Sequence, residues 1–192
     1  KSPQILELLF ESGVSIDQKT LTSHKSTPIG QAIRCRDFDC LVILLNHINP
    51  QKIDERNFSP VMKAISSNFP EAVRILVDHG ADVLYTTSEG KNALYLACFV
   101  KNEELVKYLL ENGADPTVSG YLGQYPIHWA ASSDNINIVN LILNYGADPN
   151  VFDNRGRPPT FSALNSNDNK DQILKVLLDA GCDPNAKNRV TG

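Results

Sequence analysis

The residues best suited to chemistry in this chain are its cysteines and histidines, and their spacing is not that of a reactive site. No two cysteines have the Cys-x-x-Cys spacing of a zinc site or a redox motif. Cys35 and Cys40 are close in sequence, but no histidine or cysteine cluster elsewhere could complete a zinc site with them. The histidines show neither the spacing of metal ligands nor a pairing with a nucleophile. We therefore predict no catalytic residue, no metal site, no cofactor and thiols that are buried or half-buried. The four cysteines are Cys35, Cys40, Cys98 and Cys182.

Repeated aspartates and a glycine pair are the other candidates for ligand binding. The aspartates recur at long, nearly regular intervals, each close to a glycine, which predicts carboxylates that accept hydrogen bonds in turns rather than a calcium site. Gly120 and Gly123 lie in Gly-Tyr-Leu-Gly, but no buried strand precedes them, so a phosphate loop is not predicted. The four aspartates are Asp82, Asp115, Asp148 and Asp183.

The aspartates belong to a structural unit that is clearest between Gly120 and Val151. Pro126 suits the first position of a short helix, where its missing N–H and fixed φ cost nothing. After a break at Asp134 and Asn135, residues 138–143 give an apolar stripe typical of a second helix. Gly146 ends that helix, since glycine adopts the left-handed conformation without a Cβ penalty. Two helices this short cannot bury their apolar faces alone, so the unit needs stacked copies.

The copies are found with two markers. The glycine stop recurs at Gly80, Gly113 and Gly146 at a constant interval, and at Gly181 after a slightly longer one. The start of the first helix recurs at nearly the same interval, at Pro28, Pro60, Ala93, Pro126 and Pro159. Two markers that share one period indicate a repeat array.

These motifs resemble those of the ankyrin repeat family, which has the same period. Its Thr-Pro-Leu-His-x-Ala pattern is matched by Tyr-Pro-Ile-His-Trp-Ala at 125–130, Thr-Pro-Ile-Gly-Gln-Ala at 27–32 and Ser-Pro-Val-Met-Lys-Ala at 59–64. Its Leu-Leu-x-x-Gly-Ala-Asp ending is matched at 109–115 and, with Cys for Ala, at 177–183. The resemblance implies an all-α fold: a solenoid of stacked helix–turn–helix units joined by β-turn or hairpin loops. It also implies that His128 hydrogen-bonds the backbone of a turn.

The same markers divide the chain into repeats of one predicted domain, residues 1–192. Because the chain starts inside a repeat and without Met, we expect a fragment of a longer protein. Ile48 occupies the place of a glycine stop, so Asn49 and Pro50 must end that helix, and residues 165–171 hold an insertion expected to be an exposed loop. The predicted segments are a partial repeat at 1–21, repeats at 22–53, 54–86, 87–119, 120–152 and 153–187, and the start of another at 188–192.

Composition narrows the class of partner. The net charge of −4 argues against nucleic acid, which requires a basic face, and no apolar run approaches the ~18 residues of a membrane span. Hydrophobic content of 42% and charged content of 21% are globular values. Free cysteines without a secretion signal predict the cytoplasm or the nucleus, and we expect the domain to be monomeric.

The resemblance implies a partner-binding surface on the concave face, made by turn tips and the exposed side of the first helices. Phe99, Val100, Tyr121 and Leu122 are apolar where the fold leaves positions exposed, with Trp129 close by, and aromatic residues are typical of binding hot spots. Packing between neighbouring repeats would also explain Phe99 and Trp129. The full set of predicted contact residues is Phe58, Glu89, Lys91, Phe99, Val100, Tyr121, Leu122, Gln124, Trp129, Phe152, Arg155 and Arg157.

A second predicted cluster is Arg155 and Arg157 beside Phe152, which could receive an acidic group of a partner. A solvated turn explains these arginines equally well. The family also suggests hydroxylation of asparagine at Asn150 or Asn185.

Taken together, the sequence predicts a non-catalytic module that binds a partner protein or peptide, as the recruiting or scaffolding arm of a larger protein. The alternative is a regulatory or structural spacer attached to a catalytic domain outside this segment.

Overall fold

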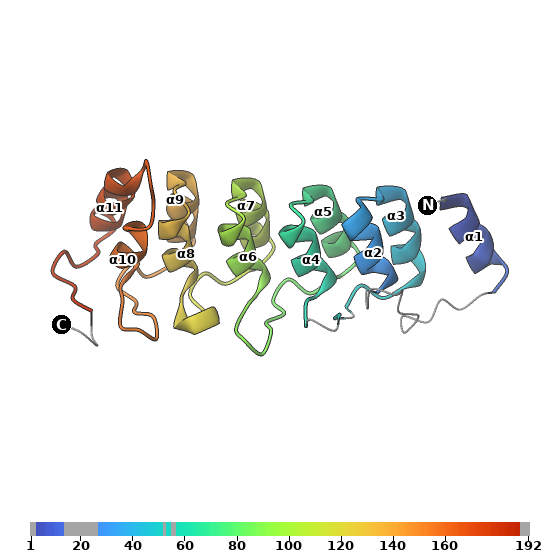
Figure 1. Cartoon of the computed structure of the whole chain (residues 1–192), viewed down its shortest axis with the longest axis horizontal. Helices are drawn as coiled ribbons and strands as arrows, with labels where there is room; N and C mark the ends of the chain where they lie inside the picture. The colour runs from blue at the N-terminus through green and yellow to red at the C-terminus, as the bar shows by residue number, and fades with distance from the viewer. Residues whose placement is uncertain (1–2, 14–26, 52, 55–56, 189–192) are drawn as a thin grey trace. The chain divides into compact units, whose positions relative to one another are not determined.

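Short helices in antiparallel pairs make up the described part of the chain in a computed structural model (Figure 1). The structure describes residues 3–13, 27–51, 53–54 and 57–188, and within these residues it contains helices and turns but no strand. Residues 14–26, at the junction of the predicted segments 1–21 and 22–53, lie outside the described residues. So do residues 189–192 of the predicted last segment. The chain divides into two units, residues 1–85 and 86–192, and each is described by itself.

The described residues of unit 1 hold one single helix and two helix pairs. The second helices of the pairs pack beside one another, as do the first helices, and α1 packs against α3. Each pair therefore uses its neighbour to bury the apolar faces that it cannot bury alone. The elements are α1 (Pro3–Glu11), α2 (Pro28–Cys35), α3 (Phe38–His47), α4 (Pro60–Ser66) and α5 (Pro70–Asp78).

Three helix pairs in two rows make up the described residues of unit 2 (Figure 1). One row contains the first helices α6, α8 and α10, and the other contains the second helices α7, α9 and α11. Small buried alanines, among them Ala97, Ala130 and Ala163, lie on the first helices and let them approach closely. The elements are α6 (Ala93–Phe99), α7 (Glu103–Glu111), the 3-10 turn η1 (Tyr121–Gly123), α8 (Pro126–Ser132), α9 (Ile136–Asn144), α10 (Pro159–Ala163) and α11 (Lys170–Asp179).

The predicted helix starts are confirmed by their caps. The side chains of Thr27, Ser59 and Asn92 each accept a hydrogen bond from the backbone N–H three residues on, which satisfies one of the free donors of the first turn. At α10 the cap position is Pro158, which provides no such side-chain bond. The capping of this helix therefore differs from that of the other first helices with a side-chain cap.

The predicted helix stops are also present. Gly80, Gly113, Gly146 and Gly181 all have positive φ, between 80° and 94°, directly after their helices. Where Ile48 replaces glycine, α3 ends at His47 and Ile48 takes an extended conformation, after which Asn49 accepts a bond from the Gln51 N–H. The irregular junction therefore ends its helix with different turn chemistry, as predicted.

The insertion between α10 and α11 is mostly exposed, as the sequence predicts, but it is also bonded to the preceding repeat. Ser166 is buried, and its hydroxyl donates to Asp134 Oδ1 at 2.9 Å. The same carboxylate accepts from the backbone N–H of Asn169, also at 2.9 Å, and this bond is the main cause of a pKa below the usual value for Asp134. The preceding repeat thus holds the insertion through Asp134, which has a left-handed φ of 62°. Ser133, next to Asp134, is buried as well.

Candidate partner-binding site

Four turn tips precede first helices and share one backbone hydrogen bond. In each, the first residue donates its N–H to the carbonyl oxygen of the fifth, at 2.8–3.1 Å. Three of the tips use the side chain of the first residue as a second acceptor, for the N–H of the fifth, whereas Gly120 has no side chain to offer. In unit 1 this bond joins Asp54 and Phe58, and in unit 2 the tips span residues 87–91, 120–124 and 153–157.

The three tips of unit 2 touch one another through their backbones. Gly90 and Gly120 lie so close that a Cβ added to Gly90 would be 2.7 Å from the Gly120 carbonyl carbon. Asn154 in the third tip donates its N–H to the Leu122 carbonyl oxygen at 3.1 Å. Leu122 has a φ of 58°, a conformation uncommon outside glycine and asparagine. The tips therefore form a continuous row beside the first helices.

Four aromatic side chains meet where this row joins α6 and α8, and we call them the aromatic patch: Tyr95, Phe99, Tyr121 and Trp129. Tyr95 lies at the centre. Its ring centroid is 4.7 Å from that of Trp129 at an interplanar angle of 90°, and 6.1–6.2 Å from those of Tyr121 and Phe99. These distances are those of favourable aromatic pairs.

The patch combines packing with exposure. Phe99 contacts Trp129 edge to face, with centroids 6.1 Å apart, and yet 59% of Phe99 is exposed. The indole N–H of Trp129 is covered and has no hydrogen-bond partner in the part of the chain that the structure describes. Tyr95, in contrast, is 9% exposed. Packing between repeats thus explains why Tyr95 is buried and Trp129 is half-buried, whereas Phe99 stays largely exposed.

Charged and apolar side chains border the patch. The Lys91 ammonium lies 4.9 Å from the centre of the Tyr121 ring, a cation–π distance, and 2.6 Å from a Glu89 carboxylate oxygen. The hydrogen bond from Lys91 to Glu89 raises the pKa of Lys91, so the ammonium is charged at neutral pH. Leu122 is 41% exposed, whereas Val100 and Gln124 are half-buried.

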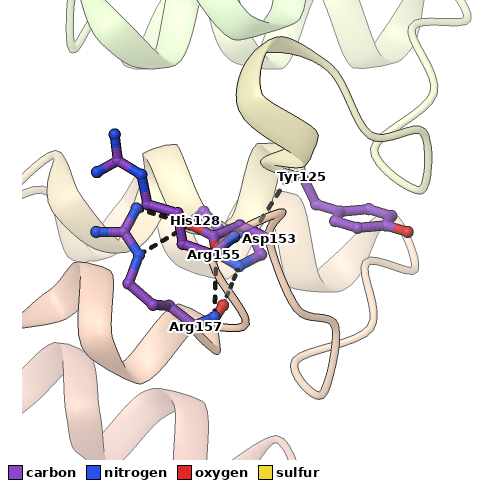
Figure 2. A network of polar contacts seen from close by, with 5 residues as sticks. All are labelled: Tyr125, His128, Asp153, Arg155 and Arg157. Atoms are coloured by element: carbon purple, nitrogen blue, oxygen red, sulfur yellow. Dashed lines mark hydrogen bonds and ion pairs between the residues drawn. The ribbon is translucent and has the colours of Figure 1, made fainter. Parts of the chain in front are cut away.

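The third tip is held by a network around one buried carboxylate (Figure 2). Arg157 donates to Asp153 Oδ2 from Nε at 3.0 Å and from Nη2 at 2.7 Å, and the N–H groups of Arg155 and Arg157 donate to Oδ1. The Asp153 side chain is 1% exposed. Although burial alone would raise its pKa, the hydrogen bonds and charge of Arg157 bring it below the usual value.

His128 connects this network to α8. Its Nδ1 accepts the Tyr125 N–H at 3.2 Å, so the ring proton is on Nε2, which donates to the Arg157 carbonyl oxygen at 3.0 Å. The predicted structural role of His128 is confirmed. Burial lowers its pKa below the ordinary value, against the opposing effects of the Arg157 hydrogen bond and the Asp153 charge.

We expect acid to destabilise the fold through His128. Because its folded pKa is below the unfolded value of about 6.5, the unfolded chain binds a proton first as pH falls through that value, and stability is lost down to the folded pKa. NMR titration of the imidazole should show neutral Nε2–H at pH 7 and an apparent pKa below 6.5. A pKa above the unfolded value would show that burial is not the dominant effect on His128.

The remaining predicted contact residues are placed as follows. Arg155 is exposed, and its guanidinium has no ion-pair partner among the described residues. Arg157 is engaged by Asp153, so only part of its side chain, 29%, is exposed to a partner. Phe152 is half-buried. Phe58 lies in a tip of unit 1, where its N–H donates to Asp54, and is described with that unit alone.

Two central residues were missed from the sequence, Tyr95 and Asp153. A signal existed for both. Tyr95 stands one repeat before His128, in the position of the motif histidine, where it contacts the next tip through an aromatic ring instead of a hydrogen bond. Asp153 stands at the same tip position as Asp54, three repeats later.

Comparison with known proteins identifies the family of this chain. The family model for ankyrin repeats (3 copies) matches residues 1–87, 32–120 and 117–188, which together cover nearly the whole chain. The chain belongs to the ankyrin repeat family. Among solved structures, the ankyrin repeat domain of Bcl-3, a unique member of the IκB protein family, is similar with a TM-score of 0.80. The identity is 24%, and the match covers 97% of this chain and 82% of that one.

Membership of this family indicates a general class of function. Ankyrin repeats generally serve as protein–protein interaction modules, and their fold is typically non-catalytic. A comparison with curated proteins found no significant match.

The aspartates beside the ankyrin glycine stops are turn acceptors, as predicted. Each accepts the N–H of the residue two positions on, at 2.7–2.9 Å. Asn150 adds a bridge to the next turn: its Nδ2 donates to the Gly181 carbonyl oxygen at 3.0 Å, and its Oδ1 accepts the Asp183 N–H at 2.8 Å. Gln51 makes the equivalent pair of bonds to Gly80 and Asp82 in unit 1. Asn150 and Asn185 are exposed, and their modification stays a prediction.

The described residues include no group of three or more metal-binding side chains, and no described helix is long and apolar enough to cross a membrane. Of the thiols, Cys98 and Cys182 are buried and Cys40 is half-buried, as predicted. The prediction is wrong for Cys35, which is exposed because it ends α2, beyond the buried residues of that helix.

The cysteines should therefore differ sharply in reactivity. Burial raises the pKa of the Cys98 thiol to about 12, so almost no thiolate forms at neutral pH. With an aromatic disulfide reagent at pH 8, we expect Cys35 to react in the native protein and Cys98 only after unfolding. Peptide mapping of the labelled protein identifies the site. Fast labelling of Cys98 without denaturant would show that α6 opens readily.

Proposed function

We propose that this ankyrin repeat array binds a partner protein on its concave face, through the aromatic patch, and acts as the recruiting or scaffolding arm of a larger protein. The observation that carries the proposal is Phe99, a large aromatic side chain that packs on Trp129 and is still 59% exposed. A rigid aromatic side chain offers a large contact area at a low cost in conformational entropy.

Three features of the patch support a binding role. Its members come from two first helices and a turn tip, the elements that form the binding face in this family. Its centre, Tyr95, is fixed by packing, so the surface is formed before a partner arrives. Its edge carries Lys91 and Glu89, which match the polar rim common at interfaces. For such a module, with free thiols, we propose the cytoplasm or the nucleus as its location.

A pull-down from cell lysate tests the proposal. The wild-type protein is compared with a Phe99→Ala/Tyr121→Ala/Leu122→Ala variant that circular dichroism shows to be folded. Leu178→Ala is the matched control, since Leu178 is an exposed apolar residue of α11, in the other helix row. We expect a partner that wild type and control capture and the triple variant loses. Equal capture by all three proteins would contradict binding at the patch, and no specific capture would favour the spacer alternative.

A further inference from the structure

Arg155, on the tip that follows the patch residue Tyr121, is a cation that remains open to a partner. Lys91 is paired with Glu89, and Arg157 is paired with Asp153. The guanidinium of Arg155, in contrast, has no carboxylate within ion-pair distance in the described part of the chain, and the residue is exposed. Figure 2 shows its side chain drawn beside the network, without a bond from its guanidinium to the residues shown.

The fold places the backbone of Arg155 on the tip next to Tyr121 of the patch. The residue before Arg155, Asn154, donates its backbone N–H to Leu122, and Leu122 follows Tyr121 of the patch. The two tips are therefore joined directly, and the same network that buries Asp153 fixes the backbone N–H of Arg155. An exposed apolar surface and an open cation thus lie on consecutive tips of a preorganised row.

Local charge differs in sign from the charge of the whole chain. The chain carries a net −4, yet its three tips at 87–91, 120–124 and 153–157 hold three cations against two carboxylates. Both carboxylates, Glu89 and Asp153, are already paired within their own tips. The charge left for a partner along this row is therefore positive.

From this arrangement we infer that the partner segment is a peptide in which an apolar side chain is followed or preceded by acidic residues. The apolar side chain packs on Phe99 and Trp129, and a carboxylate pairs with Arg155, whose planar guanidinium suits bidentate contact. The inference rests on the proposed function, and it adds the chemical class of the partner. Repulsion from Arg155 disfavours a basic segment at the same site.

Selection from a phage-displayed library of short random peptides tests the inference without a known partner. We expect enriched peptides with an aromatic or aliphatic residue close to Asp or Glu, and with a negative net charge. Affinities of the synthetic peptides follow from Trp129 fluorescence, since Trp129 is the single tryptophan and belongs to the patch. Arg155→Glu should weaken binding by about tenfold and should shift the selected peptides toward basic sequences.

Lys107→Glu provides the matched control. It makes the same change in net charge at an exposed lysine of α7, in the second-helix row, and should alter affinity by less than about twofold. Acidic peptides that bind Arg155→Glu as well as wild type would overturn the inference.

The two proposals fail in different ways. Peptides that depend on Phe99 but show no charge preference overturn the acidic class and leave the binding function intact. If no selected peptide depends on Phe99, both proposals fail. Tighter binding of a short single-stranded DNA than of any selected peptide, with loss in Arg155→Glu, would replace the peptide by a nucleic acid.

Discussion

Replacing Asp153 with alanine should cost about 3–5 kcal/mol of stability, because it leaves Arg157 without its counter-ion in a partly buried position. The carboxylate also accepts the N–H groups of Arg155 and Arg157, and these donors lose their acceptor. Removal of one member of such a pair is costly even where the intact pair contributes little, since the remaining charge is uncompensated. The measurement is urea unfolding followed by Trp129 fluorescence, which reports on unit 2.

Asp148→Ala is the matched control for Asp153. Asp148 also accepts a backbone N–H in a turn, from Asn150, but it is exposed. We expect a loss of about 1 kcal/mol or less. In a double-mutant cycle, Asp153→Ala and Arg157→Ala should be strongly non-additive. Equal costs for the two aspartates, or an additive cycle, would show that the network contributes no more than a surface turn.

The pH dependence of the same network follows from the lowered pKa of Asp153. A carboxyl group with a folded pKa below its unfolded value of about 3.9 contributes stability that is complete above that value. The contribution is lost as pH falls toward the folded pKa. Wild type should therefore lose more stability than Asp153→Asn below about pH 4.

Gly90→Ala is the second large effect, at about 2–4 kcal/mol. The substitution forces a side chain into a φ of 82° and places its Cβ against the backbone of the neighbouring tip, 2.7 Å from the Gly120 carbonyl carbon and 2.9 Å from the Tyr121 nitrogen. Because these contacts are backbone atoms, relief requires the two tips to separate. The shift would move Tyr121 relative to Tyr95, so Trp129 fluorescence should change in the folded state as well.

Gly113→Ala measures the cost of a left-handed backbone conformation without a steric clash of the new Cβ. Gly113 has a similar positive φ, 90°, but a Cβ there would meet nothing within 4 Å. We expect about 1–2 kcal/mol, from the left-handed conformation alone. The difference between the two variants measures the close approach of the tips. Equal losses of stability would contradict the contact between Gly90 and Gly120.

The sequence predicts the repeated elements well because local rules control them. Thr27, Ser59 and Asn92 cap helices, and Gly113 ends one, through interactions within a few residues in the chain. The family motif extends these rules to the whole array. The predictions of an all-α fold and of ankyrin repeats are accordingly confirmed.

Contacts between repeats were predicted less well. The role of Asp134 depends on Ser166 and Asn169 of the following repeat, so a loop that looks polar in sequence is partly buried. Tyr95 was overlooked because the sequence places it on an apolar helix, where it resembles any core residue. Its importance appears only when Phe99, Tyr121 and Trp129 are brought around it.

Site-specific photo-cross-linking at Phe99 tests the central proposal most directly. A benzoylphenylalanine side chain replaces Phe99 in one protein and Leu178 in a control, and both are irradiated in cell lysate. Because Phe99 is open on the proposed binding face and Leu178 lies in the other helix row, we predict a discrete cross-linked protein for position 99 alone. The cross-link should disappear when Tyr121 and Leu122 are also replaced by alanine. The same products from both positions, or none from position 99 while position 178 cross-links, would contradict partner binding at the aromatic patch.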